Sequence, residues 1–171
     1  MNVFFRDIKA NKKYISNLGI LYLAVYRYGN WVFYKVRIPI IRHLLWFVYK
    51  IFNLIIIQII GGGDIPARAK VGGGLMLPHG VNGVIIHGDT VIGSNVKILH
   101  QVTIGLKDGV SGVPHIGDGV VLNAGAKIIG KLFIGDGSII GANAVVTKDI
   151  PPNVVAVGVP AKILREKSSN K

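Results

Sequence analysis

Between Ile92 and Ile150 the sequence repeats every six residues: it reads IGSNVK (92–97), ILHQVT (98–103) and IGLKDG (104–109), and from Ile116 onward IGDGVV, LNAGAK, IIGKLF, IGDGSI, IGANAV and VTKDIP. Only the hexad 110–115 breaks the pattern, and the frame resumes in register at Ile116. A fixed short period is typical of proteins built from stacked coils. The first position is always aliphatic, at Ile92, Ile98, Ile104, Ile116, Leu122, Ile128, Ile134, Ile140 and Val146. The fifth position is mostly small or aliphatic, at Val96, Val102, Val120, Ala126, Leu132, Ser138, Ala144 and Ile150.

The hexad predicts a short strand that points one aliphatic side chain inward, followed by a turn with Gly, Asn or Asp at its flexible positions. Three such strands close a triangular coil, so that a residue about eighteen positions later stacks about 4.8 Å above. The sequence therefore predicts an all-β solenoid core. A sandwich of short strands also spaces its strands regularly, but it does not require aliphatic residues in strict register.

Composition and charge divide the chain into two parts. The 171 residues contain no Cys, so there is no disulfide framework and a reducing compartment is allowed. The first residues are charged early and lack a cleavage site after an apolar run, so we expect no signal peptide. Residues 1–60 hold nine Lys or Arg and one acidic residue, Asp7, which gives +8 of the total net charge of +12.

This basic arm, residues 1–60, predicts helices near 18–36 and 40–60, separated by Pro39. In the second helix the polar residues Lys35, Arg42, Lys50 and Asn53 form one narrow stripe at 100° per residue. A basic, aromatic-rich amphipathic helix favours an anionic membrane surface. Packing on the solenoid or on a neighbouring subunit is the alternative, and a membrane span is disfavoured because Arg42 and Lys50 interrupt it. No recognition motif indicates a nucleic-acid partner.

Three segments follow from these patterns: the basic arm (1–60), the solenoid (61–165) after the flexible Gly61–Gly63, and a short tail (166–171). The early hexads at Ile65, Val71 and Leu77 are out of frame with the later ones, and the slip lies between His79 and Ile86. A slip inside a solenoid requires a bulge, and bulges often lie next to functional sites. We expect a cytoplasmic protein located peripherally at the inner face of the cell membrane.

The solenoid resembles serine acetyltransferase and its relatives, the bacterial hexapeptide-repeat acetyltransferases. The resemblance rests on DIPARAKVGGGLMLPHGVNGVIIHG from Asp64, VTIG (102–105), NAGAKIIG (123–130), GANAVV (141–146) and GVPAKIL (158–164). It implies a left-handed parallel β-helix of roughly five coils after the helical arm. It also implies a homotrimer with active sites between subunits and acetyl-CoA as the acetyl donor.

His79 and Asp64 are the candidate catalytic residues. Their spacing of fifteen residues is that of the family, and fifteen residues is nearly one coil, so we expect the two side chains to be close. A carboxylate bonded to one imidazole nitrogen fixes the tautomer of the ring, and the other nitrogen then takes a proton from the acceptor hydroxyl. No Cys is present to carry an acyl group, so direct transfer is expected.

The resemblance also implies a coenzyme site. Its pantetheine groove corresponds to the small residues Gly105, Ala124, Gly125 and Ala142, and Lys148 and Lys162 are candidates to meet the phosphates. No metal is expected, because the histidine spacing of metal-dependent solenoid enzymes is not evident.

Two departures from serine acetyltransferase shape the expected acceptor. The family carries an Asp before the catalytic His, where this chain has Pro78, and its Arg-His-Pro loop is replaced by Gly112, Val113 and Pro114. With the basic arm, this looks more like the colanic acid and capsular polysaccharide acetyltransferases. We therefore expect acetylation of a sugar hydroxyl on a glycan or lipid-linked precursor, with Pro78, His100 and His115 near the acceptor. The alternatives are serine O-acetylation for cysteine biosynthesis and a non-enzymatic scaffold.

Overall fold

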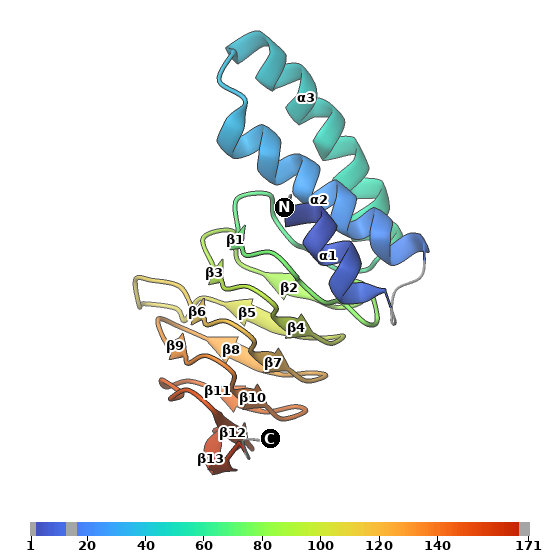
Figure 1. Ribbon diagram of the computed structural model, residues 1–171. Coiled ribbons are helices and arrows are strands. Elements are labelled where there is room, and N and C mark those ends of the chain that lie inside the picture. The colour runs from blue at the N-terminus through green and yellow to red at the C-terminus, as the bar shows by residue number, and fades with distance from the viewer. Residues whose placement is uncertain (1–2, 13–16, 168–171) are drawn as a thin grey trace.

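The computed structural model describes residues 3–12 and 17–167, and it consists of a column of β-coils with helices packed on its first coil (Figure 1). Two antiparallel helices rise from this end of the column as a hairpin, and a shorter helix lies across the first coil (Figure 1). The predicted tail falls partly on residues 168–171, which lie outside the described residues.

The column has three parallel sheets, which form the faces of a parallel β-helix. Sheet A contains β2 (Ile85–Ile86), β5 (Thr103–Gly105), β8 (Lys127–Ile129) and β11 (Val145–Val146). Sheet B contains β1 (Lys70–Val71), β3 (Val91–Ile92), β6 (His115–Ile116) and β9 (Phe133–Ile134). Sheet C contains β4 (Lys97–Ile98), β7 (Val121–Leu122), β10 (Ile139–Ile140), β12 (Val154–Val157) and the antiparallel closing strand β13 (Lys162–Glu166).

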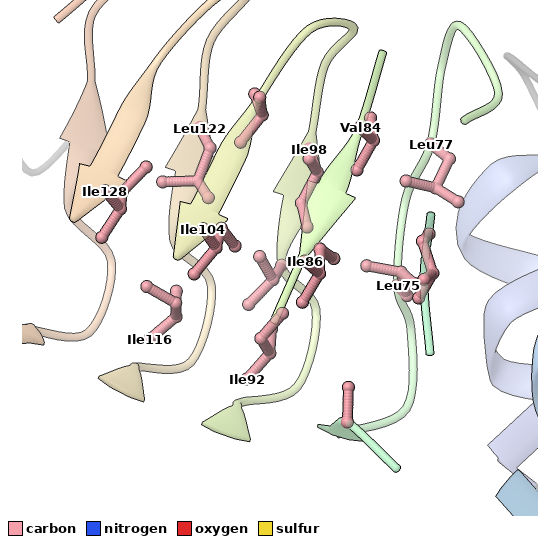
Figure 2. Packing of buried hydrophobic residues seen from close by; sticks show 14 of the residues in the cluster. Leu75, Leu77, Val84, Ile86, Ile92, Ile98, Ile104, Ile116, Leu122 and Ile128 are labelled. Atoms are coloured by element: carbon pink, nitrogen blue, oxygen red, sulfur yellow. The ribbon is translucent and has the colours of Figure 1, made fainter. Parts of the chain in front are cut away.

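The hexad prediction of the core is confirmed. Outside the irregular segment 106–113, every first position from Ile92 to Val146 is buried, and so is every fifth position from Val96 to Ile150. These side chains fill the inside of the coils in layers (Figure 2). Because each strand contributes one inward side chain per hexad, the core is a continuous stack of Ile, Val, Leu and Ala.

Two coils are longer than the eighteen-residue coil that separates Lys127 from Val145. In the first, Lys70 pairs with Val91, 21 positions later, because the turn at 78–83 is extended. This is the predicted slip between His79 and Ile86. In the second, Val91 pairs with His115, 24 positions later, because the segment 106–114 contains no strand. Both irregularities were visible as breaks in the repeat.

The arm contains three helical segments and a π-helical extension. They are α1 (Val3–Asn11), α2 (Asn17–Lys35), α3 (Pro39–Phe52) and η1 (Asn53–Ile60). The two predicted helices correspond to α2 and to α3 with η1, and Pro39 begins α3, where its missing N–H costs nothing. Helix α1 was not predicted. The polar stripe is real but turns inward, since Lys50 and Asn53 line a cleft against the solenoid and Arg42 stacks on Phe33.

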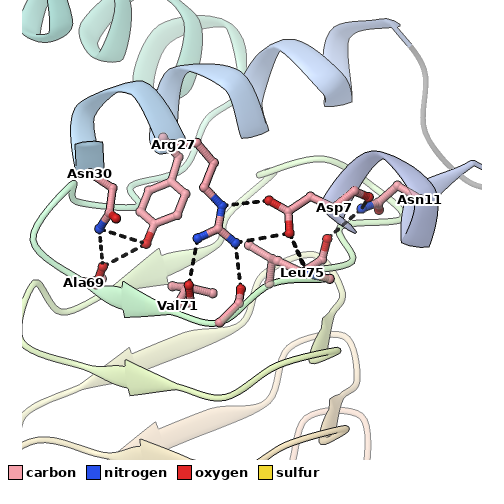
Figure 3. A network of polar contacts seen from close by, with 10 residues as sticks. Asp7, Asn11, Arg27, Asn30, Ala69, Val71 and Leu75 are labelled. Carbon is pink, nitrogen blue, oxygen red and sulfur yellow. Dashed lines mark hydrogen bonds and ion pairs between the residues drawn. The ribbon is translucent and has the colours of Figure 1, made fainter. Parts of the chain in front are cut away.

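A buried ion pair joins the arm to the first coil (Figure 3). Asp7, fully buried, accepts hydrogen bonds from Arg27 Nε at 2.7 Å and from the backbone N–H groups of Gly74 and Leu75 at 2.7 and 3.0 Å. The Arg27 guanidinium donates in turn to the carbonyl oxygens of Val71 and Gly72, each at 2.7 Å.

Neighbouring polar side chains continue this cap along the same edge. Asn11 donates to the Leu75 carbonyl at 2.6 Å and accepts from the Leu77 N–H at 3.0 Å. Tyr26 and Asn30 donate to the Ala69 carbonyl at 2.8 and 3.0 Å. The first coil has no strand beneath it, and its free N–H and C=O groups would otherwise form an exposed sheet edge. Side chains of α1 and α2 therefore replace the missing coil.

Candidate functional site

Corner turns between sheets C and A stack into a column that holds most of the predicted site residues. The wide turn at 78–83 carries His79, and the corners above it carry His100, then Ala124 and Gly125, then Ala142. Backbone hydrogen bonds connect successive corners: Gln101 N–H to Asn82 C=O, Gly125 N–H to His100 C=O, and Asn143 N–H to Ala124 C=O, at 2.8, 3.0 and 2.9 Å. We call this column the C/A corner.

Left-handed backbone recurs at one position of each corner, which explains the local residue choice. Gly83, Gln101, Gly125 and Asn143 have φ of 62°, 59°, 73° and 54°. Gly and Asn tolerate this conformation best, so the sequence NAGA forms a corner readily. Gln101 adopts it at a greater cost, directly after His100.

His79 is exposed on the wide turn and lies against His100. The two imidazole rings are 5.0 Å apart between centroids and nearly perpendicular, at 87°. The structure thus brings together the predicted base and one of the predicted acceptor contacts. Pro78 is in the same turn, directly before His79. A partly exposed pair of imidazoles at a solenoid corner can bind an acceptor hydroxyl and remove its proton.

Asp64 pairs in register with Ile85 rather than with His79. The reason is that the extra residues of the first coil lie in the turn at 78–83, which carries His79. Its backbone is tied to the wide turn, with the Asp64 N–H donating to Val84 C=O at 2.7 Å. Its side chain lines a cleft of about 590 Å³ against α3 and η1, together with Tyr49 and Gln58. Burial raises the pKa of the Asp64 carboxyl, and a hydrogen bond from Gln58 opposes that shift.

No hydrogen bond joins Asp64 to His79 among the side-chain contacts of the described residues, so the expected carboxylate–imidazole bond is not formed here. The catalytic roles of both residues stay predictions. Tyr49 in the same cleft accepts from the Ala67 N–H at 3.1 Å, and burial raises its pKa to about 12. Tyr49 is therefore held in place beside the Asp64 carboxyl in this cleft.

The predicted coenzyme residues lie at two ends of sheet A. Ala124, Gly125 and Ala142 belong to the C/A corner, whereas Gly105 ends β5, beside the 106–114 segment. A Cβ on Gly105 would meet only Ile129 Cδ1, at 3.8 Å, so the surface over Gly105 is open. Lys162 begins β13, close to the last corner, and Lys148 lies beyond β11; both side chains are exposed.

Lys127 belongs to the NAGAKIIG motif but was not among the predicted site residues, and it lies on the outward side of sheet A between these two ends. Its Nζ donates to the Gln101 carbonyl at 2.6 Å and to Thr103 Oγ1 at 3.1 Å. The sequence does mark this lysine: it is the sixth residue of its hexad, directly before the inward-facing Ile128 of a sheet A strand. Sequence reasoning followed small residues and missed this cation.

His115 lies in sheet B, apart from His79 and His100 at the C/A corner. It begins β6 in sheet B and lines a separate pocket of about 410 Å³ with Gly112, Val113, Lys131 and Phe133, among others. The structure therefore does not bring His115 to the C/A corner of its own chain. In the described parts of the chain, no three His, Cys, Asp or Glu side chains cluster as metal ligands do.

Comparison with known proteins identifies the solenoid. The family model described as bacterial transferase hexapeptide (six repeats) matches residues 114–148. The stacked hexads and the exposed histidine corner thus define a hexapeptide-repeat transferase. Serine acetyltransferase from Buchnera aphidicola subsp. Schizaphis graminum is 34% identical over 186 aligned positions, which cover 100% of this chain and 67% of the relative. The chain belongs to the serine acetyltransferase family.

Other relatives agree with this assignment. Serine acetyltransferase from Salmonella typhimurium is 38% identical over 155 residues, and the chain spans about half of its length, 53%. Soybean serine acetyltransferase complexed with serine superposes with a TM-score of 0.79 at 31% identity, covering 95% of this chain and 68% of that one. The Brucella abortus enzyme in complex with coenzyme A gives 0.80 at 31% identity, covering 98% and 68%. The left-handed β-helix with N-terminal helices is the fold of these proteins.

The expected sugar acceptor is wrong. The relatives and solved structures described above are serine acetyltransferases, and the expected likeness to colanic acid and capsular polysaccharide acetyltransferases is not supported. The error came from treating Pro78 and the loop residues Gly112 and Val113 as excluding an amino acid. Loss of a charged contact from one chain's sequence does not show which groups bind the acceptor.

Proposed function

We propose that this chain is a serine O-acetyltransferase, which transfers the acetyl group of acetyl-CoA to the hydroxyl of L-serine. The observation that carries the proposal is the 34% identity to a serine acetyltransferase along the full length of this chain, arm included. Solved relatives that bind serine and coenzyme A share the fold at TM-scores of 0.79 and 0.80.

His79 is the proposed general base. Its exposure on the wide turn leaves room for the serine Oγ, and its contact with His100 restricts where the ring can lie. In the proposed step, an imidazole nitrogen of His79 takes the hydroxyl proton as Oγ attacks the thioester carbonyl. The tetrahedral intermediate collapses by breaking the C–S bond, and the leaving thiolate receives the proton from the imidazolium. The products are O-acetylserine and coenzyme A.

Asp64 is the proposed positioning residue for His79. Its backbone holds the turn that carries His79, and its carboxyl lies in a partly buried cleft where a developing imidazolium would favour the charged form. A carboxylate in this role fixes the imidazole tautomer and stabilises the cation that forms.

The surface of sheet A between Gly105 and the C/A corner is the proposed coenzyme site. It combines the open surface over Gly105 with the small corner residues Ala124 and Ala142, which let an extended chain approach the backbone. At Gly125 the space that a Cβ would take is filled by Asn143, so this glycine serves the corner itself. Lys127, Lys148 and Lys162 supply positive charge for phosphate groups. We further propose a homotrimer with the site between subunits, in which His115 would reach the acceptor of a neighbouring copy.

The experiment is thiol release from acetyl-CoA by the purified full chain, with L-serine and without acceptor. We expect serine-dependent release that falls about 100- to 10,000-fold in His79→Ala. The matched control is His87→Ala, because His87 lies outside the C/A corner and its imidazole accepts a hydrogen bond from a local backbone N–H, that of Asp89. Release that does not depend on L-serine contradicts the proposed acceptor, and full activity in His79→Ala contradicts the proposed base.

A further inference from the structure

The outward side of α3 and η1 is a long apolar face that none of the described residues covers. Its residues follow helical spacing, and several are more than half exposed: Ile40 is 84%, Leu44 66% and Phe47 64% exposed. We call this the outer face and define it by Ile40, Leu44, Phe47, Ile51, Ile55 and Ile59. Pro39–Ile60 is long and apolar enough to cross a membrane. Its most apolar stretch of 18 residues has a mean hydropathy of 1.8, and 22% of that stretch is buried.

An apolar groove between α2 and α3 extends this surface. It has a volume of about 330 Å³ and is lined almost wholly by carbon, from residues that include Leu21, Tyr28, Val48, Phe52 and Ile56. Exposed apolar patches of this extent on a folded protein indicate a binding surface. The hairpin carries this surface beyond the end of the solenoid (Figure 1).

The positive charge near the outer face favours an anionic partner. Lys35 and Arg37 lie at the tip of the hairpin, and both are exposed. From residue 8 to residue 63 the sequence contains no Asp or Glu. A second copy docked on this face would therefore bring like charges together without a counter-charge, whereas anionic lipid headgroups supply the opposite charge. Trp31 is 50% exposed on α2, and such a side chain favours the membrane–water interface.

The opposite side of α3 is fixed to the protein, which decides how the helix meets a bilayer. Tyr49 and Ile57 are buried, and Tyr49 is bonded to the Ala67 N–H of the first coil. A helix that crossed the bilayer would lose these contacts. We infer that the hairpin of α2 and α3 lies on an anionic membrane surface, with the outer face inserted among the lipids and Lys35 and Arg37 at the headgroups. This goes beyond acetyl transfer and does not depend on it.

Co-sedimentation of the full chain with phosphatidylcholine vesicles, with and without about 30% phosphatidylglycerol, tests this inference. We expect binding to the anionic vesicles that weakens in high salt. Lys35→Gln and Arg37→Gln should each lower the partition coefficient about fivefold. Leu44→Gln with Phe47→Gln should lower it by about tenfold or more. The matched control, Ile163→Gln with Leu164→Gln, changes equally exposed apolar residues on β13 at the far end of the column and should bind as wild type does.

Circular dichroism of each variant confirms that it is folded, and its serine-dependent thiol release reports the proposed function separately. Absence of binding to anionic vesicles by the folded wild type overturns the inference. So does a fall in oligomer mass of Leu44→Gln with Phe47→Gln, measured by light scattering, if vesicle binding is unchanged, because the outer face is then a contact between copies. Resistance of the bound protein to extraction by salt and alkali overturns it in favour of a membrane span.

Discussion

The cap of the first coil predicts that Asp7→Ala is one of the most destabilising single changes in the chain. Asp7 is 0% exposed and Arg27 11%, with 2.7 Å between Arg27 Nε and the carboxylate. Removing the carboxylate leaves a buried guanidinium without its counter-charge, which costs about 3–5 kcal/mol. It also leaves the N–H groups of Gly74 and Leu75 unpaired. For a chain of this size the loss corresponds to a fall in Tm of roughly 6–20 °C.

Two further variants separate the charge from the backbone contacts. Asp7→Asn keeps an oxygen that can accept from the Gly74 and Leu75 N–H groups, so we expect a smaller loss than in Asp7→Ala. Asp89→Ala removes the exposed ion pair between Arg68 and Asp89, whose side chains are 51% and 52% exposed, and should cost about 0–1 kcal/mol.

The assay is thermal and urea unfolding followed by circular dichroism, at a single protein concentration because an oligomer's Tm depends on concentration. Equal losses for Asp7→Ala and Asp89→Ala would refute the reasoning that α1 and α2 cap the solenoid through a buried pair.

Three predictions concern the site. Gly125→Ala should cost about 1–2 kcal/mol of unfolding free energy, because φ at Gly125 is 73° and the new Cβ would collide with Asn143 Oδ1; an unchanged urea midpoint would show that the corner relaxes freely. Gly105→Ala should leave that midpoint unchanged, since the position is open, but raise the KM for acetyl-CoA; an unchanged KM argues against coenzyme contact there. Burial raises the pKa of Asp64, so the folded state holds this proton more tightly than the unfolded state and loses stability as pH rises above 3.8. Asp64→Asn should therefore flatten that pH dependence and raise stability at neutral pH while lowering kcat; a steeper dependence would contradict the assigned cause.

The repeat made the solenoid predictable, since one aliphatic residue in six specifies both the strand and its inward face. Even the irregular coils were visible, because each break in the hexad frame became a longer turn or a loop. The position of His79 in such a turn followed from the same pattern. The register of Asp64, which pairs with Ile85, did not, because counting residues along a coil fails where that coil has gained residues.

The cap could not be predicted because its partners are far apart in sequence. Asp7 bonds Gly74, 67 residues away, and no local pattern marks either residue. Likewise, the polar stripe of the second helix was found, but its direction depends on which side packs against α2 and the first coil. The acceptor was misjudged because Pro78 and the loop residues Gly112 and Val113 show only that this chain lacks certain charged side chains. They do not show which other groups bind the acceptor.

The measurement that bears most directly on the account is the identification, by mass spectrometry, of the product formed from acetyl-CoA and L-serine by the full chain. We expect O-acetyl-L-serine in amounts equal to the coenzyme A released, and almost none with His79→Ala. Coenzyme A release without acetylated serine, or equal product from His79→Ala, would contradict it.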